Sequence, residues 1–282
     1  MKIFRYIIIC VLSLFPLICQ ADTLLKFGVY TSDKPSAVVK QFRSILNAIE
    51  SGMSQRLGEQ VKIKMQVAST YEIGIQDIVT GTVDFSRFGP ASYITATRRN
   101  PKLTILAMES KKGEKRFNGV ICVAKNSPIQ TIKNLKGRSF AFGNKLSTIG
   151  RYLSQLYLFE HGIKASDLSS YEYLGRHDRV GTAVAIGKFD AGALKESTFK
   201  KLINKGKPLR ALVTFPNVTK PWIARSGLNK KISHALKETL LSIKDPKVLK
   251  FLKKDGFLPG SDTDYHIIRK AMAKNHFFFN NQ

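Results

Sequence analysis

The sequence is poor in cysteine, and this limits how the chain can be held together. It has three cysteines in 282 residues, and two of them, Cys10 and Cys19, lie in a short N-terminal segment. Cys122 then has no partner for an internal disulfide. Its neighbours Val120-Ile121-Cys122-Val123-Ala124 indicate a buried strand residue. The five histidines show no paired ligand spacing either, so we expect no metal site and no cofactor.

Acidic residues are also scarce. Aspartate and glutamate number 20 against 46 lysines and arginines, which gives a formal net charge of +26. In a cytosolic chain such an excess favours nucleic acid as a partner. Here the basic residues are spread along the chain without one dominant run, and the N-terminus predicts export, so we expect no nucleic acid. The charge instead attracts anions in general, small molecules included.

Long hydrophobic runs are missing except at the N-terminus. Lys2 and Arg5 precede an apolar run at residues 7–18, which is followed by the small residue Ala21. This pattern predicts a secretory signal peptide, residues 1–21, cleaved after Ala21. No later run approaches the roughly 20 apolar residues that a membrane span needs. We therefore expect a periplasmic protein, and Ile18 before Cys19 argues against a lipid anchor.

Strand-like and helix-like segments alternate along the rest of the chain. Residues 61–67 alternate apolar and polar side chains, and residues 35–57 place apolar side chains on one helical face. Strands are predicted at 24–30, 61–67, 83–85, 103–109, 120–124, 139–142, 171–174, 191–194, 209–215 and 222–224. This alternation predicts an α/β fold with mainly parallel sheets.

Two features predict a division into two lobes. The polar stretch at residues 110–118 interrupts the alternation, and helices predicted at 230–243, 246–254 and 263–275 end the chain. An all-helical end cannot build its own sheet, so we expect it to pack on the first lobe. The first lobe would comprise residues 22–118 plus 217–282 and the second residues 119–216, joined by two crossings. Two such lobes around a hinge form a cleft that closes on a ligand.

The strongest candidate for chemistry follows the strand at residues 139–142. Ser147, Thr148 and Gly150 lie in the helix start Gly143-Asn144-Lys145-Leu146-Ser147-Thr148-Ile149-Gly150. Free N–H groups and the positive end of the helix dipole make such a start an anion site, and hydroxyls add donors. Ser147 as a simple helix cap is the alternative interpretation.

Further candidates follow neighbouring strands. Gly175-Arg176-His177-Asp178 follows the strand at 171–174, at the edge where ligands of open α/β sheets collect. His177 is placed to donate to an anionic oxygen, and we expect Asp178 to cap the next helix. Tyr71 and Tyr93 follow first-lobe strands and are candidates for the opposite wall, or for packing.

Four stretches occur along the mature chain in a specific order and spacing. They are Phe27-Gly28-Val29-Tyr30; Gly81-Thr82-Val83-Asp84 with Phe88-Gly89-Pro90-Ala91-Ser92-Tyr93; Ser147-Thr148-Ile149-Gly150; and Gly175-Arg176-His177-Asp178 with Gly187-Lys188-Phe189-Asp190-Ala191-Gly192-Ala193. With them the chain resembles the periplasmic phosphonate-binding proteins of ABC transporters, which bind phosphonate, phosphite or phosphate.

The resemblance implies a two-lobed type II periplasmic-binding-protein fold, no enzyme activity, and delivery of the ligand to a membrane permease. It implies that the oxyanion is bound by Ser147, Thr148, Gly150 and His177, and that the other wall is formed by Tyr71 and Tyr93. It also gives Asp84 and Asp190 structural roles. Ile149 departs from a family serine and removes a hydroxyl, and only Glu196 is a candidate partner for a substrate amine.

Three alternatives remain open from the sequence. The chain could report its ligand to a membrane sensor instead of a permease, or bind another anion such as a sulfonate or carboxylate. An enzyme would use Ser147, His177 and Asp178 as nucleophile, base and orienting acid, but the strained Gly-x-Ser-x-Gly turn of such nucleophiles is missing.

Overall fold

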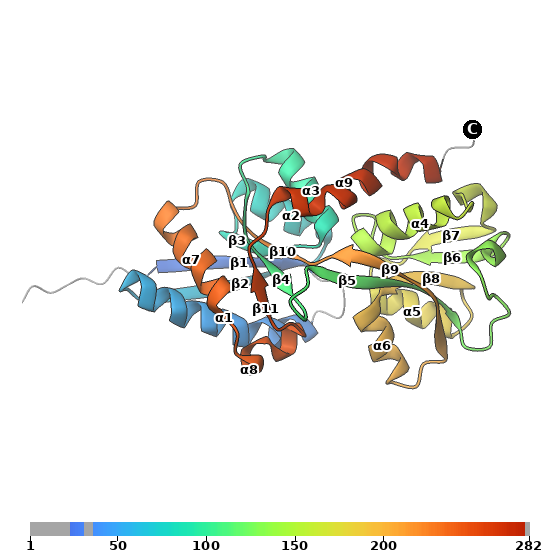
Figure 1. Ribbon diagram of the computed structural model, residues 1–282, viewed down its shortest axis with the longest axis horizontal. Coiled ribbons are helices and arrows are strands. Elements are labelled where there is room, and N and C mark those ends of the chain that lie inside the picture. Colours follow the sequence, from blue (N-terminus) through green and yellow to red (C-terminus); the bar gives the residue numbers. More distant parts are fainter. Residues whose placement is uncertain (1–22, 31–35, 280–282) are drawn as a thin grey trace, which may run out of the picture.

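The computed structural model describes residues 23–30 and 36–279, so the predicted signal peptide lies outside the described residues. Two α/β lobes lie side by side along the long axis of the molecule (Figure 1). The predicted α/β fold class is therefore confirmed, but the prediction of mainly parallel sheets was wrong, because both sheets mix parallel and antiparallel pairs. Within the described ranges, no helix combines the length and apolar character that crossing a membrane requires.

The first lobe is built on a six-stranded sheet of order β11-β4-β10-β3-β1-β2. β1 pairs in parallel with β2 and β3, whereas β10 and β11 are antiparallel to their neighbours. Its strands are β1 (Thr23–Tyr30), β2 (Val61–Ala68), β3 (Phe85–Arg87), β4 (Thr104–Ser110), β10 (Pro221–Ala224) and β11 (Gly256–Leu258). Its helices are α1 (Ser36–Leu57), α2 (Tyr71–Thr80), α3 (Pro90–Arg99), α7 (Lys230–Ser242), α8 (Pro246–Leu249) and η4 (Lys250–Leu252).

The second lobe has a five-stranded sheet of order β7-β6-β8-β5-β9. Its strands are β5 (Arg116–Ala124), β6 (Ser139–Phe142), β7 (Ser170–Tyr173), β8 (Ala191–Lys195) and β9 (Leu209–Val218). Its helices are η1 (Ile132–Leu135), η2 (Thr148–Leu153), α4 (Ser154–Glu160), η3 (Ala165–Asp167), α5 (His177–Ala185) and α6 (Glu196–Ile203). Cys122 of β5 is fully buried, as predicted, and burial raises the pKa of its thiol to about 12.

The chain passes between the sheets twice, from β4 to β5 and from β9 back to β10. The two connections lie next to each other, because Thr219 N donates to Lys115 O at 2.9 Å. β5 begins at Arg116, inside the polar stretch predicted to separate the lobes, where it pairs with the end of β9. The predicted boundaries at 118/119 and 216/217 thus fall within these two strands.

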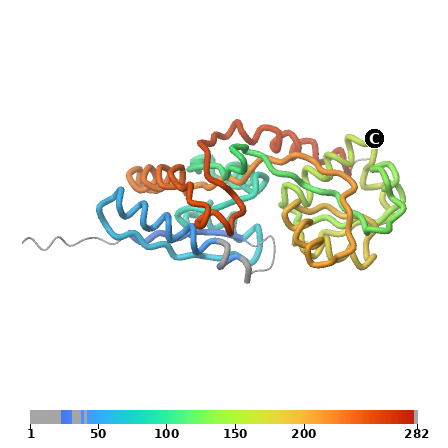
Figure 2. The backbone as a smooth tube through the Cα atoms, turned by 60° about the horizontal axis from the view of Figure 1, so that its bottom comes forward, coloured from blue at the N-terminus to red at the C-terminus, as the bar shows by residue number. Residues whose placement is uncertain are grey.

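The end of the chain differs from the prediction in two ways. It is not all-helical, since β11 adds an edge strand beside β4, and its buried Phe257 packs edge-on against Trp222 at 5.5 Å. It also does not pack on the first lobe alone. The last elements are η5 (Asp262–Tyr265), α9 (His266–Ala273) and η6 (Lys274–Phe278), and they run from the first lobe to the second (Figure 2).

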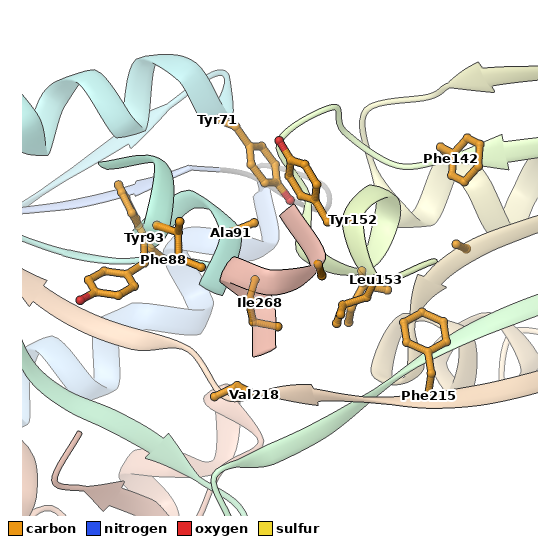
Figure 3. Packing of buried hydrophobic residues seen from close by; sticks show 14 of the residues in the cluster. Tyr71, Phe88, Ala91, Tyr93, Phe142, Tyr152, Leu153, Phe215, Val218 and Ile268 are labelled. Carbon is orange, nitrogen blue, oxygen red and sulfur yellow. The ribbon is translucent and has the colours of Figure 1, made fainter. Parts of the chain in front are cut away.

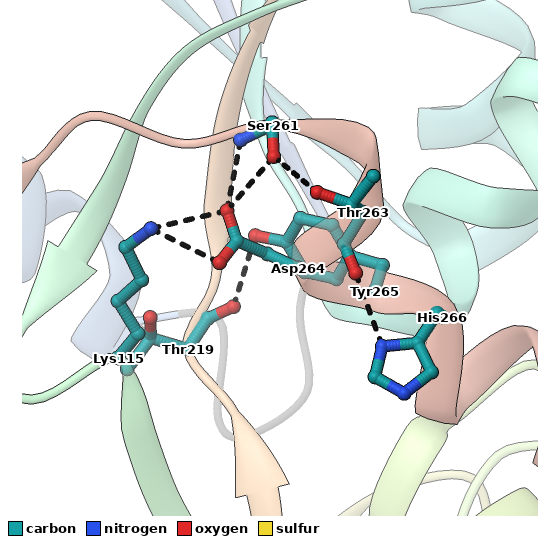
Figure 4. Close-up of polar contacts among 7 residues, drawn as sticks. All are labelled: Lys115, Thr219, Ser261, Thr263, Asp264, Tyr265 and His266. Carbon is teal, nitrogen blue, oxygen red and sulfur yellow. Dashed lines mark hydrogen bonds and ion pairs between the residues drawn. The ribbon is translucent and has the colours of Figure 1, made fainter.

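This C-terminal segment, residues 261–279, is anchored at both ends. At its start, Ser261 and Asp264 form a capping box, and Lys115 Nζ lies 3.0 and 3.1 Å from the Asp264 carboxylate (Figure 4). At its end, Asn275 Nδ2 donates to Gln155 Oε1 of α4 at 2.8 Å. The segment therefore ties the hinge to the second lobe.

One apolar cluster continues from the first lobe into the second (Figure 3). The first lobe contributes Phe88 and Ala91, the second contributes Phe142 and Leu153, and α9 adds Ile268 between them. A separate cluster under α1 and α7 fills the far side of the first lobe. The lobes are therefore in direct contact in this conformation.

Candidate functional site

A small cavity of about 30 Å³ lies where the lobes meet. Its lining comes from both lobes and from the connections between them: Tyr30, Tyr71, Gly89, Pro90, Phe117, Ser147, Thr148, Ile149, His177, Lys195, Asn217 and Lys220. One buried water needs about 10–15 Å³, and pockets for drug-sized ligands start near 300 Å³. In this conformation the cavity is therefore sized for a group of a few heavy atoms.

Four helices begin at residues that line this cavity. Tyr71 is the first residue of α2, Pro90 of α3, Thr148 of η2, which continues into α4, and His177 of α5. A helix N-terminus carries a positive partial charge from its unpaired N–H groups. Four such ends around one small space create a positive potential that favours an anion.

The helix start at Ser147 is held by two close backbone approaches. Gly143 N donates to Gly150 O at 2.7 Å, and a Cβ on Gly150 would lie 2.7 Å from Gly143 Cα, so only glycine fits there. Ser147 Oγ accepts from Gly150 N at 2.9 Å. That bond uses an oxygen lone pair and leaves the Ser147 hydroxyl hydrogen to donate elsewhere. The first turn here, η2, is π-helical, a form frequent at functional sites.

Thr148 connects the lobes across the cavity. Its Oγ1 accepts from Ala91 N, in the first turn of α3, at 2.8 Å. Next to it, the buried Ile149 lines the cavity with an apolar surface at the position where the resemblance calls for a serine. The second lobe thus presents two hydroxyls and one apolar side chain at this helix start.

The first-lobe wall is a pair of packed tyrosines. The ring centres of Tyr30 and Tyr71 lie 4.0 Å apart. Tyr30 Oη donates to Ser92 Oγ at 2.8 Å and accepts from Gly89 N at 2.7 Å. Burial raises the pKa of Tyr30, although these two hydrogen bonds and Arg87 act to lower it. Its hydroxyl therefore stays neutral and fixes the loop before α3.

The charged side chains among the lining residues are cationic. Lys195 comes from the end of β8 and Lys220 from the connection between β9 and β10, and the lining residues that the structure describes include no aspartate or glutamate. Asn217, at the end of β9, is 3% exposed, and its Oδ1 accepts from Val218 N at 2.8 Å. This bond fixes the amide, and Asn217 Nδ2 is buried without a hydrogen-bond partner among the described residues. A buried unsatisfied donor costs about 1–3 kcal/mol, which a ligand oxygen would offset.

The structure brings four of the six predicted site residues to this cavity, namely Tyr71, Ser147, Thr148 and His177. Gly150 lies behind it as part of the close backbone contact. Tyr93 is elsewhere: its Oη donates to Asp262 Oδ1 at 2.8 Å, and its ring packs on Tyr265 at 4.9 Å. The C-terminal segment covers that face of α3, which the sequence pattern did not reveal.

One local prediction was wrong. Asp178 was expected to cap α5, but the helix begins one residue earlier, at His177, with Arg176 at the N-cap position. Asp178 lies inside the first turn, where both its oxygens accept from Arg176 at 3.1 Å. A carboxylate in a first helical turn is favourable with the helix dipole, so the ion pair fits this position.

Eight lining residues were not nominated from the sequence, and the polar ones among them are Tyr30, Lys195, Asn217 and Lys220. Tyr30 is the last residue of β1, so the signal used for Tyr71, a tyrosine at the C-terminal end of a first-lobe strand, was present. Asn217 lies at the end of β9 and Lys220 in the connection that follows it, and no periodicity marks either as a site residue.

Comparisons with known proteins identify the family of this chain. The family model described as "ABC transporter, phosphonate, periplasmic substrate-binding protein" matches residues 27–265. The probable ABC transporter phosphite binding protein PhnD1 of Prochlorococcus marinus (strain MIT 9301) is 26% identical over 226 residues, covering 74% of this chain and 75% of that protein. The phosphate-import protein PhnD of Mycolicibacterium smegmatis (strain ATCC 700084 / mc(2)155) is 28% identical over 184 residues, 61% of this chain and 57% of that protein. This chain thus spans little more than half of the second relative.

The fold has a near match among solved structures. The structure of PhnD1 from Prochlorococcus marinus (MIT 9301) in complex with methylphosphonate superimposes with a TM-score of 0.78 at 24% identity, covering 90% of this chain and 99% of that chain. This likeness confirms the predicted two-lobed type II periplasmic-binding-protein fold. The family match, which covers most of the chain, confirms the resemblance drawn from the sequence. The protein therefore belongs to the family of periplasmic substrate-binding proteins of phosphonate ABC transporters.

Proposed function

We propose that this protein captures a small phosphorus oxyanion, such as phosphite, phosphate or methylphosphonate, in the periplasm and delivers it to the permease of an ABC importer. The observation that carries the proposal is the cavity where four helix N-termini converge with two lysines, and where no described lining residue is a carboxylate. Relatives named for phosphite binding and phosphate import, and a relative's complex with methylphosphonate, support the same ligand class.

The proposed site has a definite division of roles. Ser147 and Thr148 donate their hydroxyl hydrogens, and Asn217 Nδ2 supplies a third neutral donor. The cationic residues Lys195 and Lys220 line the same space and balance the ligand charge. The remaining wall is formed by Tyr30, Tyr71 and His177, and Gly150 holds the helix start in place.

The site does not suit a ligand with an amino group. An ammonium needs a carboxylate or other acceptors in a desolvated site, and among residues 23–30 and 36–279 no lining residue carries a carboxylate. Glu196, the candidate from the sequence, pairs with Lys200 at 2.6 Å within α6. We therefore expect methylphosphonate to bind more tightly than 2-aminoethylphosphonate.

The proposal is that of a binding protein and not of an enzyme. Ser147 Oγ is fixed as the cap of its own helix by Gly150 N. The Asp178 carboxylate, which an enzyme would use to orient His177, is bonded through both oxygens to Arg176. Ser147 and Asp178 therefore have structural roles, as a helix cap and as an ion-pair partner, which differ from the roles of a nucleophile and of an acid that orients a histidine.

A thermal-shift screen of residues 22–282 tests the proposal. The panel contains phosphite, phosphate, methylphosphonate, 2-aminoethylphosphonate, methanesulfonate and acetate. A ligand at 100 times its dissociation constant adds about 2.7 kcal/mol of stability. We expect a phosphorus oxyanion to stabilise the wild type and Ser147→Ala to lose that shift, while Ser197→Ala, an exposed serine in α6, keeps it. No shift with any phosphorus compound would contradict the proposal.

A further inference from the structure

A buried cluster of charges lies at the hinge, next to the cavity. Glu109, near the end of β4, is fully buried, and its carboxylate accepts from Arg87 Nε at 2.5 Å and Nη2 at 3.1 Å. Lys254 Nζ lies 3.7 Å from the other side of the same carboxylate, at Oε2. Trp222 Nε1 contacts Glu109 Oε1 at 3.4 Å. The cluster joins β3, β4, β10 and the residues just before β11.

Two residues of the cavity lining are in direct contact with this cluster. Lys254 Nζ lies 5.3 Å from the centre of the Phe117 ring, and Phe117 lines the cavity. Glu109 N donates to Lys220 O at 3.1 Å, and Lys220 also lines the cavity. The Lys254 ammonium thus contacts an aromatic ring that also lines the ligand space.

The cluster carries more positive than negative charge. Arg87 and Lys254 have side chains only 10% exposed, and both face the single buried carboxylate of Glu109. Burial opposes ionisation of Glu109, but Arg87, Lys254 and Lys220 outweigh it and hold its pKa at about 2. The buried pair of Arg87 and Glu109 is neutral overall, so Lys254 is the surplus charge.

The other charged neighbours of Lys254 do not remove this surplus. Lys111 and Asp255 also act on it, both are exposed, and their charges are opposite. Burial, assisted by Arg87 and Lys111, lowers the pKa of Lys254, whereas Glu109 and Asp255 raise it. The surplus charge is therefore costly in the empty protein, and an anion beyond Phe117 would offset that cost.

We propose that Lys254 determines specificity without touching the ligand: its ammonium behind Phe117 makes the cavity favour oxyanions with two negative charges over those with one. The inference rests on the proposed function and adds a charge preference to it. Coulomb energy scales with the charge of the ligand, so a dianion gains twice what a monoanion of the same shape gains. A poorly hydrated charge behind an aromatic ring is screened less by salt than an exposed one.

Methylphosphonate and methanesulfonate provide the matched pair of ligands, because they have nearly the same shape and differ by one charge above the second ionisation of the phosphonate. Lys254→Met keeps the apolar stem over Phe117 and removes the charge, and Lys254→Arg keeps the charge. We expect Lys254→Met to raise the dissociation constant, measured by calorimetry, about tenfold for methylphosphonate and about threefold for methanesulfonate. The effect is smaller for methanesulfonate because a monoanion loses half the Coulomb energy that a dianion loses. Lys254→Arg should retain the wild-type ratio of the two constants.

The control is Lys247→Met, an exposed lysine of α8 whose loss changes the net charge equally. It should leave both constants unchanged. If methanesulfonate binds too weakly to measure, the dissociation constants of methylphosphonate are compared below and above the pH of its second ionisation, where it is a monoanion and a dianion. The same comparison in Lys254→Arg corrects for titration of the protein. Equal weakening of both ligands, or an unchanged methylphosphonate constant in Lys254→Met, would overturn the inference alone. A wild type that binds no phosphorus oxyanion would overturn the proposed function itself.

Discussion

The two lobes use the same turn to build their sheets but contribute different chemistry to the cavity. In the first lobe Asp84 Oδ2 accepts from Lys26 N at 2.8 Å, and in the second Asp190 Oδ2 accepts from Ser139 N at 2.8 Å. Each aspartate follows a glycine by three residues, Gly81 at φ 79° and Gly187 at φ 75°, in the left-handed region that glycine adopts without strain. The structural roles expected for both aspartates are confirmed.

Beyond this shared turn the lobes diverge. The first lobe supplies packed tyrosines and the buried charges around Glu109, whereas the second supplies hydroxyl donors at a helix start. The same turn occurs in both lobes because it joins a helix to a strand in each sheet. The side chains that face the cleft differ because its two walls contribute different groups to the ligand. The comparison indicates that the first lobe provides a rigid wall and an electrostatic potential, whereas the second lobe provides hydrogen-bond donors that contact the ligand.

The largest expected effect is on the buried charges of the first lobe. Glu109→Gln removes the only carboxylate of the cluster and leaves Arg87 and Lys254 facing each other in a buried site. Breaking a buried ion pair by removing one partner costs about 3–5 kcal/mol. Urea unfolding measures this cost, with the exposed Glu114→Gln as the matched control. A loss as small as the control's would show that the cluster does not stabilise the first lobe.

The same residue gives the protein a defined response to acid. The pKa of Glu109 is about 2 in the folded protein against 4.5 in its ordinary range. Because the folded pKa is depressed, this contribution is present above about pH 4.5 and is lost as the pH falls toward 2, on the order of 3 kcal/mol in all. The unfolding temperature should therefore change less with pH in Glu109→Gln than in the wild type over that window. Equal pH dependence in the two proteins would contradict the lowered pKa of Glu109.

The shared turn allows a direct test of the likeness between the lobes. Asp84→Asn and Asp190→Asn each replace a charged acceptor of a strand amide by a neutral one, and bonds to charged groups contribute about 1.5–3 kcal/mol against about 0.5–1.5 kcal/mol for neutral ones. Asp84 also accepts from the charged Arg225 at 2.9 Å, whereas the second bond of Asp190 comes from the neutral Ser139 hydroxyl at 2.8 Å, so the loss of stability should be larger for Asp84→Asn. Urea unfolding of the two variants measures the loss in the free energy of unfolding for each. A larger loss for Asp190→Asn than for Asp84→Asn would contradict the expected order.

A smaller effect is expected where the C-terminal segment meets the second lobe. Asn275→Ala leaves Gln155 Oε1 of α4 without its donor, although Gln155 Nε2 still donates to Tyr173 Oη at 2.8 Å. We expect a loss of about 1–2 kcal/mol, against no measurable loss for the exposed Lys274→Ala. Faster amide hydrogen exchange in α4 of Asn275→Ala would locate the effect in the second lobe. A change in exchange confined to the first lobe would contradict this expectation.

Much of the fold was predictable because its strands alternate with amphipathic helices. The strand predicted at residues 139–142 is β6 with the same bounds, and most others differ by one or two residues. β11 was missed because three residues carry too short a pattern. α6 was expected only as a helix in the interval between two strands, without bounds, because just Thr198 and Leu202 of its eight residues are buried and leave little periodicity to detect.

The site was predictable only where it follows the ends of strands. Ser147, Thr148 and His177 follow the parallel strands β6 and β7, and the position of such loops is set by topology. Asn217 became a candidate only once the buried donor was seen, because it lies at the end of β9, where the surroundings depend on how the lobes meet. Tyr93 was misplaced for a related reason: the path of the C-terminal segment over α3 is a long-range contact.

Calorimetric titration with methylphosphonate, of the wild type and of Asn217→Asp, tests the central claim most directly. Asp has the shape of Asn but would place a negative charge where the cavity has a buried donor. The account predicts one methylphosphonate per wild-type chain and a loss of affinity of about a hundredfold or more in Asn217→Asp, because a like charge at contact distance repels a dianion strongly. Equal affinity in both proteins would show that the ligand does not bind in this cavity.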